Sequence, residues 1–194
     1  MLEQDNVKKE EEIHADFEHT YVTYFSRMVR FAGEYVWSEE DAKDVVQDVF
    51  TDLWEKRHVY TDRISVTAFI FTSIKNKCID YLRHRLKVRE AEDLMQEEYR
   101  RESKLKFDTL EAFNQSILTE EDVEKVIREA ADKLPEKCRE IFIKSKFEGK
   151  KQKEIALELN ISENTVETQM GIAYTKLREI LEDYLPLLLF LIYW

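Results

Sequence analysis

Glycine and proline are scarce in this chain, with three Gly and two Pro among 194 residues. Tight turns and the ends of strands depend on these residue types, so their scarcity argues against a fold rich in β-strands. Hydrophobic residues make up 43% of the chain, which supports buried cores and excludes a disordered protein. The composition therefore predicts an all-α fold of one or two small domains.

Cysteine and histidine are also few, with two Cys and four His in the whole chain. Cys78 and Cys138 lie in different helical segments and have neither metal-ligand spacing nor a disulfide framework around them. They are predicted to be buried free thiols in a reducing compartment, with a redox pair as the alternative. No glycine-rich phosphate loop and no nucleophile motif is found, so we expect no enzyme activity, catalytic residue, metal, cofactor or small-molecule substrate.

Long apolar runs are limited to the C-terminal tail, Leu185–Trp194, which reads LPLLLFLIYW. A membrane span needs about 20 apolar residues, so this tail is too short to cross a bilayer. The acidic, polar N-terminus does not resemble a signal peptide, and we expect a cytoplasmic protein. The tail either folds onto the core of the last domain or docks on a partner or a second copy.

Positive charge is in deficit, and the formal net charge is −11. This balance argues against a protein that coats DNA in general. The charge is uneven, however: residues 61–87 hold six Lys or Arg against two Asp or Glu, and residues 133–180 hold ten against eight. Two positive segments in an acidic chain indicate two separate contacts with nucleic acid.

The stretch Lys151–Arg178 has the pattern of a helix-turn-helix. Ile155, Ala156 and Leu159 mark a short helix with one buried face. Asn160 tolerates the left-handed backbone that ends helices, and Ser162 is a good N-cap for a second amphipathic helix. In DNA-binding proteins of this design the second helix lies in the major groove, whereas the alternative is an ordinary helical hairpin with a solvated face.

The outward face of that second helix is polar and contains no Arg. Amide, carboxylate and hydroxyl side chains can bond to base edges, and this face offers Glu163, Asn164, Thr165, Glu167, Thr168 and Gln169. Lysines precede it and suit phosphates, which position a domain without reading sequence; they are Lys144, Lys146, Lys150, Lys151 and Lys153.

An acidic face is predicted on an earlier helix. Ser38 caps that helix, and Asp41 three residues later is close to a capping box. Apolar side chains from Val45 to Trp54 form the buried side of this helix. The opposite side carries acids at helical spacing with no interleaved lysine, and consists of Asp41, Asp44, Gln47, Asp48 and Asp52. It is either a solvated face or a docking surface for a basic partner.

A basic helix is predicted over Val66–Leu86. Phe69, Ile70, Ile74, Cys78 and Leu82 form its expected buried stripe. Its basic groups are interleaved with Phe71, Asn76 and Tyr81, a mixture that suits single-stranded DNA because rings stack on bases while cations follow the backbone; they are Lys75, Lys77, Arg83, Arg85 and Lys87. The alternative is a helix whose aromatic residues are all in the core. Residues 88–118 are charged and poor in apolar residues, and are predicted to be a partly helical linker.

Four passages in this order resemble bacterial sigma factors of the extracytoplasmic-function (ECF) group of the sigma-70 family. They read EEDAKDVVQDVFTDLWEKR from Glu39, FIFTSIKNKCIDYLRHR from Phe69, LPEKCREIFIKSKFEGKKQKEIALELNIS from Leu134 and ENTVETQMGIAYTKLRE from Glu163. The first resembles the polymerase-binding helix, the second the minus-ten helix, and the last two the minus-thirty-five domain. The resemblance covers about residues 15–87 and 120–182, and the apolar tail is similar to tails of Bacteroidetes-type members.

The resemblance implies a non-enzymatic transcription initiation factor with two helical domains. Region 2 would span residues 1–87, a linker 88–118, region 4 residues 119–182, and the tail 183–194. The implied partners are core RNA polymerase, promoter DNA and an anti-sigma factor, which could be anchored in a membrane. Core polymerase would bind Asp41, Asp44, Gln47, Asp48 and Asp52.

The resemblance also implies two sets of promoter contacts. Tyr60 lies in the loop that captures a flipped base of the minus-ten element, and the expected minus-ten contacts are Tyr60, Lys75, Asn76, Lys77, Asp80 and Arg83. The expected minus-thirty-five contacts are Lys151, Lys153, Ser162, Glu163, Asn164, Thr165, Glu167, Thr168 and Gln169.

The chain departs from this family at two points of the helix-turn-helix. Relatives often carry basic residues where this chain has Glu167 and Gln169, and Asn160 replaces the more usual Gly of the turn. The alternative function is a stand-alone helix-turn-helix regulator in which residues 1–87 form a sensor or dimerisation domain. A helical adaptor is a third interpretation, and the two basic segments argue against it.

Overall fold

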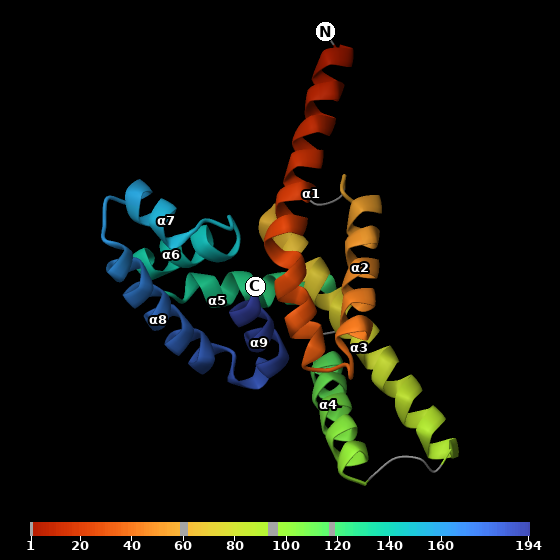
Figure 1. Cartoon of the computed structure of the whole chain (residues 1–194). Coiled ribbons are helices and arrows are strands. Elements are labelled where there is room, and N and C mark those ends of the chain that lie inside the picture. The colour runs from red at the N-terminus through yellow and green to blue at the C-terminus, as the bar shows by residue number, and fades with distance from the viewer. Residues whose placement is uncertain (1, 59–61, 93–96, 117–118) are drawn as a thin grey trace. The chain divides into compact units, whose positions relative to one another are not determined.

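The computed structural model describes residues 2–58, 62–92, 97–116 and 119–194. Within these ranges the regular structure is entirely helical, so the predicted all-α fold is confirmed. In chain order the helices are α1 (Leu2–Gly33), α2 (Glu39–Glu55), α3 (Arg63–Glu92), α4 (Glu97–Ser116), α5 (Glu120–Asp132), α6 (Glu136–Lys146), α7 (Gln152–Glu158), α8 (Glu163–Ile180), the 3₁₀ helix η1 (Glu182–Tyr184) and α9 (Leu185–Tyr193) (Figure 1). The described part of the predicted linker is mostly helical, because α3 continues to Glu92 and α4 fills Glu97–Ser116.

The helices are grouped into two compact units. Unit 1 contains Met1–Thr61 and Ser73–Phe107, and unit 2 contains Asp62–Thr72 and Asp108–Trp194. Helices α3 and α4 therefore each contribute residues to both units. The first turns of α3 belong to unit 2, although the sequence analysis assigned residues 1–87 to a single domain.

Unit 1 is built on the pairing of α1 with α2. The apolar residues of α1 recur at helical spacing, and Tyr24, Met28 and Phe31 are buried. Phe50 of α2 is buried opposite them, with its ring centroid 5.3 Å from that of Tyr21 in an edge-to-face arrangement. Such aromatic pairs stabilise a packed helix pair beyond the area they bury, which fixes α2 against α1.

Unit 2 contains the predicted helix-turn-helix and the helices that support it. Helix α5 begins at a capping box, in which the Thr119 hydroxyl accepts from the Asp122 N–H and the Asp122 carboxylate accepts from the Thr119 N–H. Pro135 directly precedes α6, a position where proline suits the start of a helix. Phe142 of α6 is buried, as are Val166, Met170 and Leu177 of α8. The packing of α6 and α7 against α8 holds the motif together (Figure 1).

The C-terminal tail folds onto unit 2. Helix α9 buries Pro186, Leu187, Leu188, Phe190 and Leu191, and Trp194 is also buried. Of the two interpretations offered by the sequence, this is the intramolecular one. No helix among the described residues combines the length and the apolar character that crossing a membrane requires.

Both cysteines are buried free thiols, as predicted. Burial raises the pKa of Cys78, on α3, to about 12. The pKa of Cys138, on α6, is raised by burial as well, against a weaker opposing effect of the Lys176 charge. The Cys138 thiol donates to the backbone carbonyl of Gln169 at 3.3 Å and so connects α6 to α8.

Candidate nucleic-acid and partner interfaces

The turn between α7 and α8 forms as the sequence predicts. Asn160 has a φ of 52°, in the left-handed region, and the Ile161 N–H then donates to the Ala156 carbonyl at 3.0 Å. The Ser162 hydroxyl accepts from the Thr165 N–H at 3.1 Å and begins α8. Because this hydrogen bond holds the Ser162 hydroxyl at the N-terminus of α8, the position of Ser162 relative to α8 is fixed.

The predicted reading face of α8 is exposed in the structure. Glu163, Asn164, Thr165, Glu167 and Thr168 are exposed, and Gln169 is half-buried. Two hydroxyls are engaged locally: that of Thr168 donates to the Asn164 carbonyl at 2.8 Å, and that of Thr165 lies 2.8 Å from the Ser162 hydroxyl. The Asn164 amide and the two carboxylates remain the groups best suited to base edges.

The lysines before α8 do not form one uniform cationic surface. Lys151 and Lys153 are exposed at the start of α7. Lys144 and Lys150 both reach the Glu158 carboxylate, at 3.2 and 2.8 Å, and the hydrogen bonds from Lys150 and then Lys144 lower the Glu158 pKa. Local acid therefore neutralises part of the predicted phosphate-binding charge.

Lys146 was predicted to contact phosphates, but the structure buries it. Its side chain is 6% exposed, and its ammonium donates to the backbone carbonyl of Ile192 at 3.0 Å. The same ammonium lies 5.4 Å from the centroid of the Tyr174 ring, a cation–π arrangement. Lys146 faces the tail because it occupies the buried stripe of α6, so it holds the tail in place instead of facing solvent.

The acidic face of α2 is present as a ridge, formed by Asp44, Gln47, Asp48 and Asp52. The first three are exposed, and Asp52 is half-buried. Lys77 of α3 lies 3.1 Å from the Asp48 carboxylate and 4.0 Å from that of Asp52. One basic residue from α3 thus offsets part of the ridge, a feature that the sequence of α2 alone could not predict.

Asp41 differs from the other acids because its carboxylate is engaged with its own unit. It accepts from the Ser38 hydroxyl at 2.7 Å and from the Tyr81 hydroxyl at 2.8 Å, and Arg85 lies 3.7 Å away. Burial acts to raise the Asp41 pKa, but these hydrogen bonds and the Arg85 charge outweigh it, so the pKa is lowered. Asp41 therefore joins the start of α2 to α3.

The polar side of α3 is only partly exposed. Asn76, Asp80 and Arg83 are exposed, and Arg83 pairs with Asp80 at 2.7 Å. Two residues that the sequence analysis placed on the DNA-facing side are buried: Lys75 is 1% exposed, and Phe71 is fully buried. Both lie on the same stripe as Ile74, Cys78 and Leu82, because helical spacing brings their side chains into the core. Tyr60 lies outside the described residues.

Two family models match the chain in the order in which these surfaces occur. The model for Sigma-70 region 2 matches residues 20–88, and the model for Sigma-70, region 4 matches residues 124–177. Together they cover more than half of the chain. The chain belongs to the sigma-70 family. No curated protein matches the sequence.

Membership of the sigma-70 family supports a role for this chain in promoter recognition. Region 2 contains α2 and most of α3, and region 4 contains the helix-turn-helix of α7 and α8. A sigma factor takes part in promoter recognition, and region 4 carries the DNA-binding helix-turn-helix.

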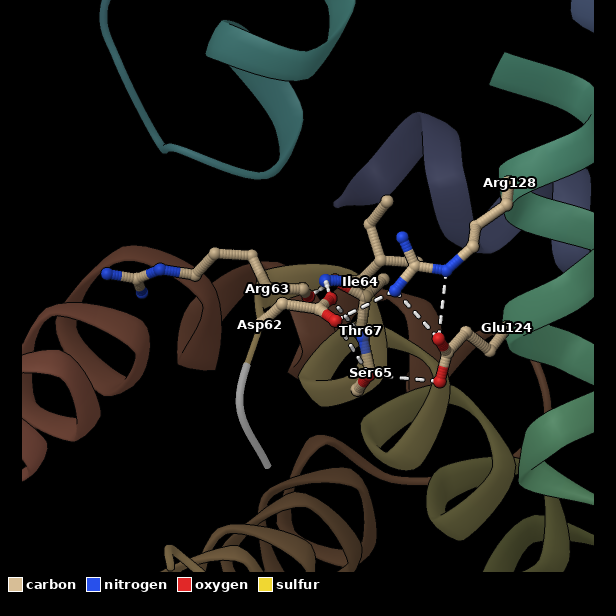
Figure 2. A network of polar contacts seen from close by, with 7 residues as sticks. All are labelled: Asp62, Arg63, Ile64, Ser65, Thr67, Glu124 and Arg128. Atoms are coloured by element: carbon tan, nitrogen blue, oxygen red, sulfur yellow. Dashed lines mark hydrogen bonds and ion pairs between the residues drawn. The ribbon is translucent and has the colours of Figure 1, made fainter. Parts of the chain in front are cut away.

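A polar network within unit 2 of this sigma factor is not indicated by any pattern in the sequence (Figure 2). Arg128 of α5 pairs with Asp62 at 2.8 Å and with Glu124 at 2.7 Å, and Glu124 in turn accepts from the Ser65 hydroxyl at 2.9 Å. Only the Glu124–Arg128 spacing of four residues is visible in the sequence. Asp62, just before α3, lies 66 positions from Arg128, and Ser65 of α3 lies 59 positions from Glu124, so no local pattern connects them to α5.

Proposed function

We propose that this sigma-70 family member is an ECF-group factor that binds core RNA polymerase, directs it to promoters, opens the minus-ten element and reads the minus-thirty-five element. The observation that carries the proposal is the match of region 2 to residues 20–88 and of region 4 to residues 124–177, in this order along the chain. Its proposed partners are core polymerase, promoter DNA and an anti-sigma factor. We further propose that the factor has no catalytic step of its own and that it acts in the cytoplasm.

Core polymerase is proposed to bind the ridge on α2. Asp44, Gln47 and Asp48 present exposed polar groups at helical spacing, and Asp52 continues their line. A row of carboxylates suits a basic partner surface, and such complementarity contributes to specificity and association rate more than to raw affinity. Asp41 is a less direct participant, because its carboxylate is already bound by Ser38 and Tyr81.

The minus-ten strand is proposed to bind the exposed polar side of α3. Asn76, Lys77, Asp80 and Arg83 supply an amide and charges along one helix. Tyr60, which lies outside the described residues, is proposed to hold a flipped base. Opening a duplex costs a few kcal/mol for each base that is unstacked, and capture of the extruded base offsets that cost.

The upstream duplex is proposed to bind α8 and the start of α7. Asn164 and the carboxylates of α8 would read base edges, while Lys151 and Lys153 would contact phosphates. The free factor carries a net charge of −11 and repels DNA in general. Promoter binding is therefore expected to depend on prior association with polymerase.

The test is run-off transcription with core polymerase and a library of promoter templates. The full chain is expected to give discrete start sites that core polymerase alone does not give. Asp44→Lys should lower the yield at limiting factor, because it reverses charge on the ridge. Glu182→Lys makes the same charge change at an exposed site in η1 and serves as the matched control.

A gel shift without polymerase separates this function from that of a stand-alone regulator. The isolated factor is expected to show only weak, salt-sensitive DNA binding. Tight and sequence-specific binding by the isolated chain, with no transcription from core polymerase, would contradict the proposal and favour the stand-alone regulator.

A further inference from the structure

The first half of α4 is folded against region 2, although it lies in the segment that the sequence predicts to be a linker. Residues 97–107 follow the region 2 match, which ends at residue 88. By their contacts they belong to unit 1, together with α1, α2 and most of α3. This part of α4 therefore adds a helix to the unit that carries region 2, outside the residues that the family model covers.

One face of α4 makes the contacts with unit 1. Ser103, Lys106 and Phe107 are three or four positions apart, so their side chains lie on the same side of the helix, and Ser103 is fully buried. The Lys106 ammonium lies 5.6 Å from the centroid of the Trp37 ring, in the turn between α1 and α2. That turn is joined to α3, because the Trp37 N–H donates to the Tyr81 hydroxyl at 3.4 Å. Lys106 therefore attaches α4 to the part of unit 1 where α2 begins.

Phe107 contacts a residue of α3 that is proposed to bind the promoter strand. The Arg83 guanidinium lies 5.9 Å from the centroid of the Phe107 ring, within the range of a cation–π contact. The Nη1 of Arg83 also donates to the Asp80 carboxylate at 2.7 Å. The Arg83 side chain is nevertheless 44% exposed, so its guanidinium is accessible to a ligand from solvent.

These two contacts restrict the Arg83 side chain before a strand binds. Arginine has several rotatable bonds, and immobilising such a side chain on binding opposes association. A planar guanidinium that is already oriented loses less freedom when a phosphate or a base edge binds it. A carboxylate orients the guanidinium but offsets its charge toward an anion, whereas an aromatic ring orients it without adding a negative charge. The Phe107 ring is therefore suited to prepare Arg83 for nucleic acid.

We propose that residues 97–107 work as a part of region 2 and that Phe107 is a positioning residue, which holds the Arg83 guanidinium ready for the minus-ten strand. This inference rests on the proposed function, in which Arg83 binds that strand. Phe107 acts through Arg83 and not by contacting DNA, and the first half of α4 stays packed on unit 1 while the strand binds. A segment between the two family matches thus contributes to promoter opening.

The rate of open-complex formation by the full-length factor with core polymerase tests this role. At limiting factor, Phe107→Ala should lower the rate about threefold, which is the size expected for an exposed cation–π contact. Phe107→Tyr keeps an aromatic face and should restore the rate, whereas Phe107→Leu keeps apolar bulk without that face and should not. An unchanged rate in Phe107→Ala, or a full rate in Phe107→Leu, would overturn the inference.

A double variant separates positioning from a contribution of Phe107 to folding. If Phe107 acts through Arg83, then Phe107→Ala should cause no further loss in a chain that already carries Arg83→Ala, measured where Arg83→Ala retains activity. Both single variants should also make the opening rate less sensitive to salt, because each weakens the contact of the same cation with the strand. A threefold loss that persists in the Arg83→Ala chain would overturn the positioning role.

Leu105→Ala is the matched control. Leu105 is an apolar residue of the same helix, two positions before Phe107, and it is 67% exposed. This variant should leave the opening rate unchanged, and a loss equal to that of Phe107→Ala would overturn the inference because it would reflect general destabilisation of α4. If the unaltered chain directs no transcription, the proposed function itself fails. If the chain is active and Arg83→Ala is impaired while Phe107→Ala is not, only the positioning role fails.

Discussion

Two helices of this sigma factor are proposed to face DNA, and their polar side chains are bound in different ways. On α8, the side-chain hydrogen bonds of the reading face stay within the helix and its cap, as for Thr168 and Asn164. On α3, Arg83 pairs with Asp80 of the same helix, but Lys77 pairs with Asp48 of α2, so part of this surface is bound to another element of unit 1. The polar side chains on the reading face of α8 are therefore not bound to the other described helices, whereas some of those on α3 must leave a neighbouring helix before they can contact DNA.

This difference matches the two tasks proposed for them. A helix that reads an intact duplex can be rigid and fully formed before it binds, because the duplex already presents its base edges in the major groove. A surface that binds an opened strand meets a ligand that does not exist until the duplex separates. The pairing of Lys77 with Asp48, on the ridge proposed to bind polymerase, would couple strand binding to docking, because a polymerase residue that pairs with Asp48 would release Lys77.

The largest expected effect concerns the packing that keeps α8 fully formed. Leu177 is 1% exposed in unit 2, so Leu177→Ala should lower the free energy of unfolding by about 2–5 kcal/mol through lost burial and a cavity. Urea unfolding followed by circular dichroism measures the change. Leu157→Ala makes the same substitution on α7 at a site that is 75% exposed and should change stability by less than about 0.5 kcal/mol. Equal losses in both variants would contradict a core centred on Leu177.

The next effect concerns sequence reading by α8. Asn164→Ala should cost about 1–3 kcal/mol of discrimination at one base pair of the minus-thirty-five element, because an amide can make two hydrogen bonds to the major-groove edge of adenine, at N6 and N7. Selection of promoters from a randomised library by the holoenzyme measures this as a relaxed preference at one position. Lys153→Ala is the contrasting variant, since loss of a phosphate contact should weaken all promoters alike and reduce the salt slope by about 0.9. A uniform loss in Asn164→Ala would contradict base reading by that residue.

Local chemistry made the helix-turn-helix predictable. The left-handed turn at Asn160, the cap at Ser162 and the buried stripe of α8 each depend on residues within about four positions of one another. The acidic ridge of α2 and the capping box at Thr119 were predictable for the same reason. Periodicity and capping carry this information because hydrogen bonds within helices connect near neighbours in the chain.

Long-range packing was not predictable from these patterns. The sequence presents Lys75, Lys146 and Phe71 as members of basic or aromatic clusters, and only tertiary contacts bury them. The pairing of Asp62 with Arg128 spans 66 positions. Helical periodicity assigns a residue to a face, but it does not show which neighbour covers that face. Roles of the individual site residues on α2, α3 and α8 stay predictions.

A moderate effect is expected from the carboxylate that joins α2 to α3. The Asp41 pKa is lowered, so its contribution to stability is complete above the ordinary carboxyl value near 3.9 and is lost as pH falls through the lowered value. Asp41→Asn should therefore be less stable than the unaltered chain at pH 6, by about 1 kcal/mol, and the gap should narrow below pH 4. Urea unfolding at both pH values measures it, and Asp44→Asn, an exposed carboxylate on the same helix, controls for loss of charge alone. If the stability difference between Asp41→Asn and the unaltered chain grew as the pH fell, the ionised Asp41 carboxylate would not be the stabilising group.

The smallest expected effect tests whether polar side chains of α3 can give up their contacts with α2. The Lys77 and Asp48 side chains are 33% and 67% exposed, and partly exposed pairs of this kind couple by about 0.2–1 kcal/mol. A double-mutant cycle of Lys77→Ala and Asp48→Ala, read by urea unfolding, should give a coupling in this range that shrinks as salt is raised. Both single variants should also lower the yield of transcription under conditions in which they remain folded, because each residue is also proposed to bind a partner. A coupling above about 2 kcal/mol would mean that the Lys77–Asp48 pair is too strong to be displaced by a partner. The polar surface of α3 would then differ from that of α8 because its contacts with α2 persist when a partner binds.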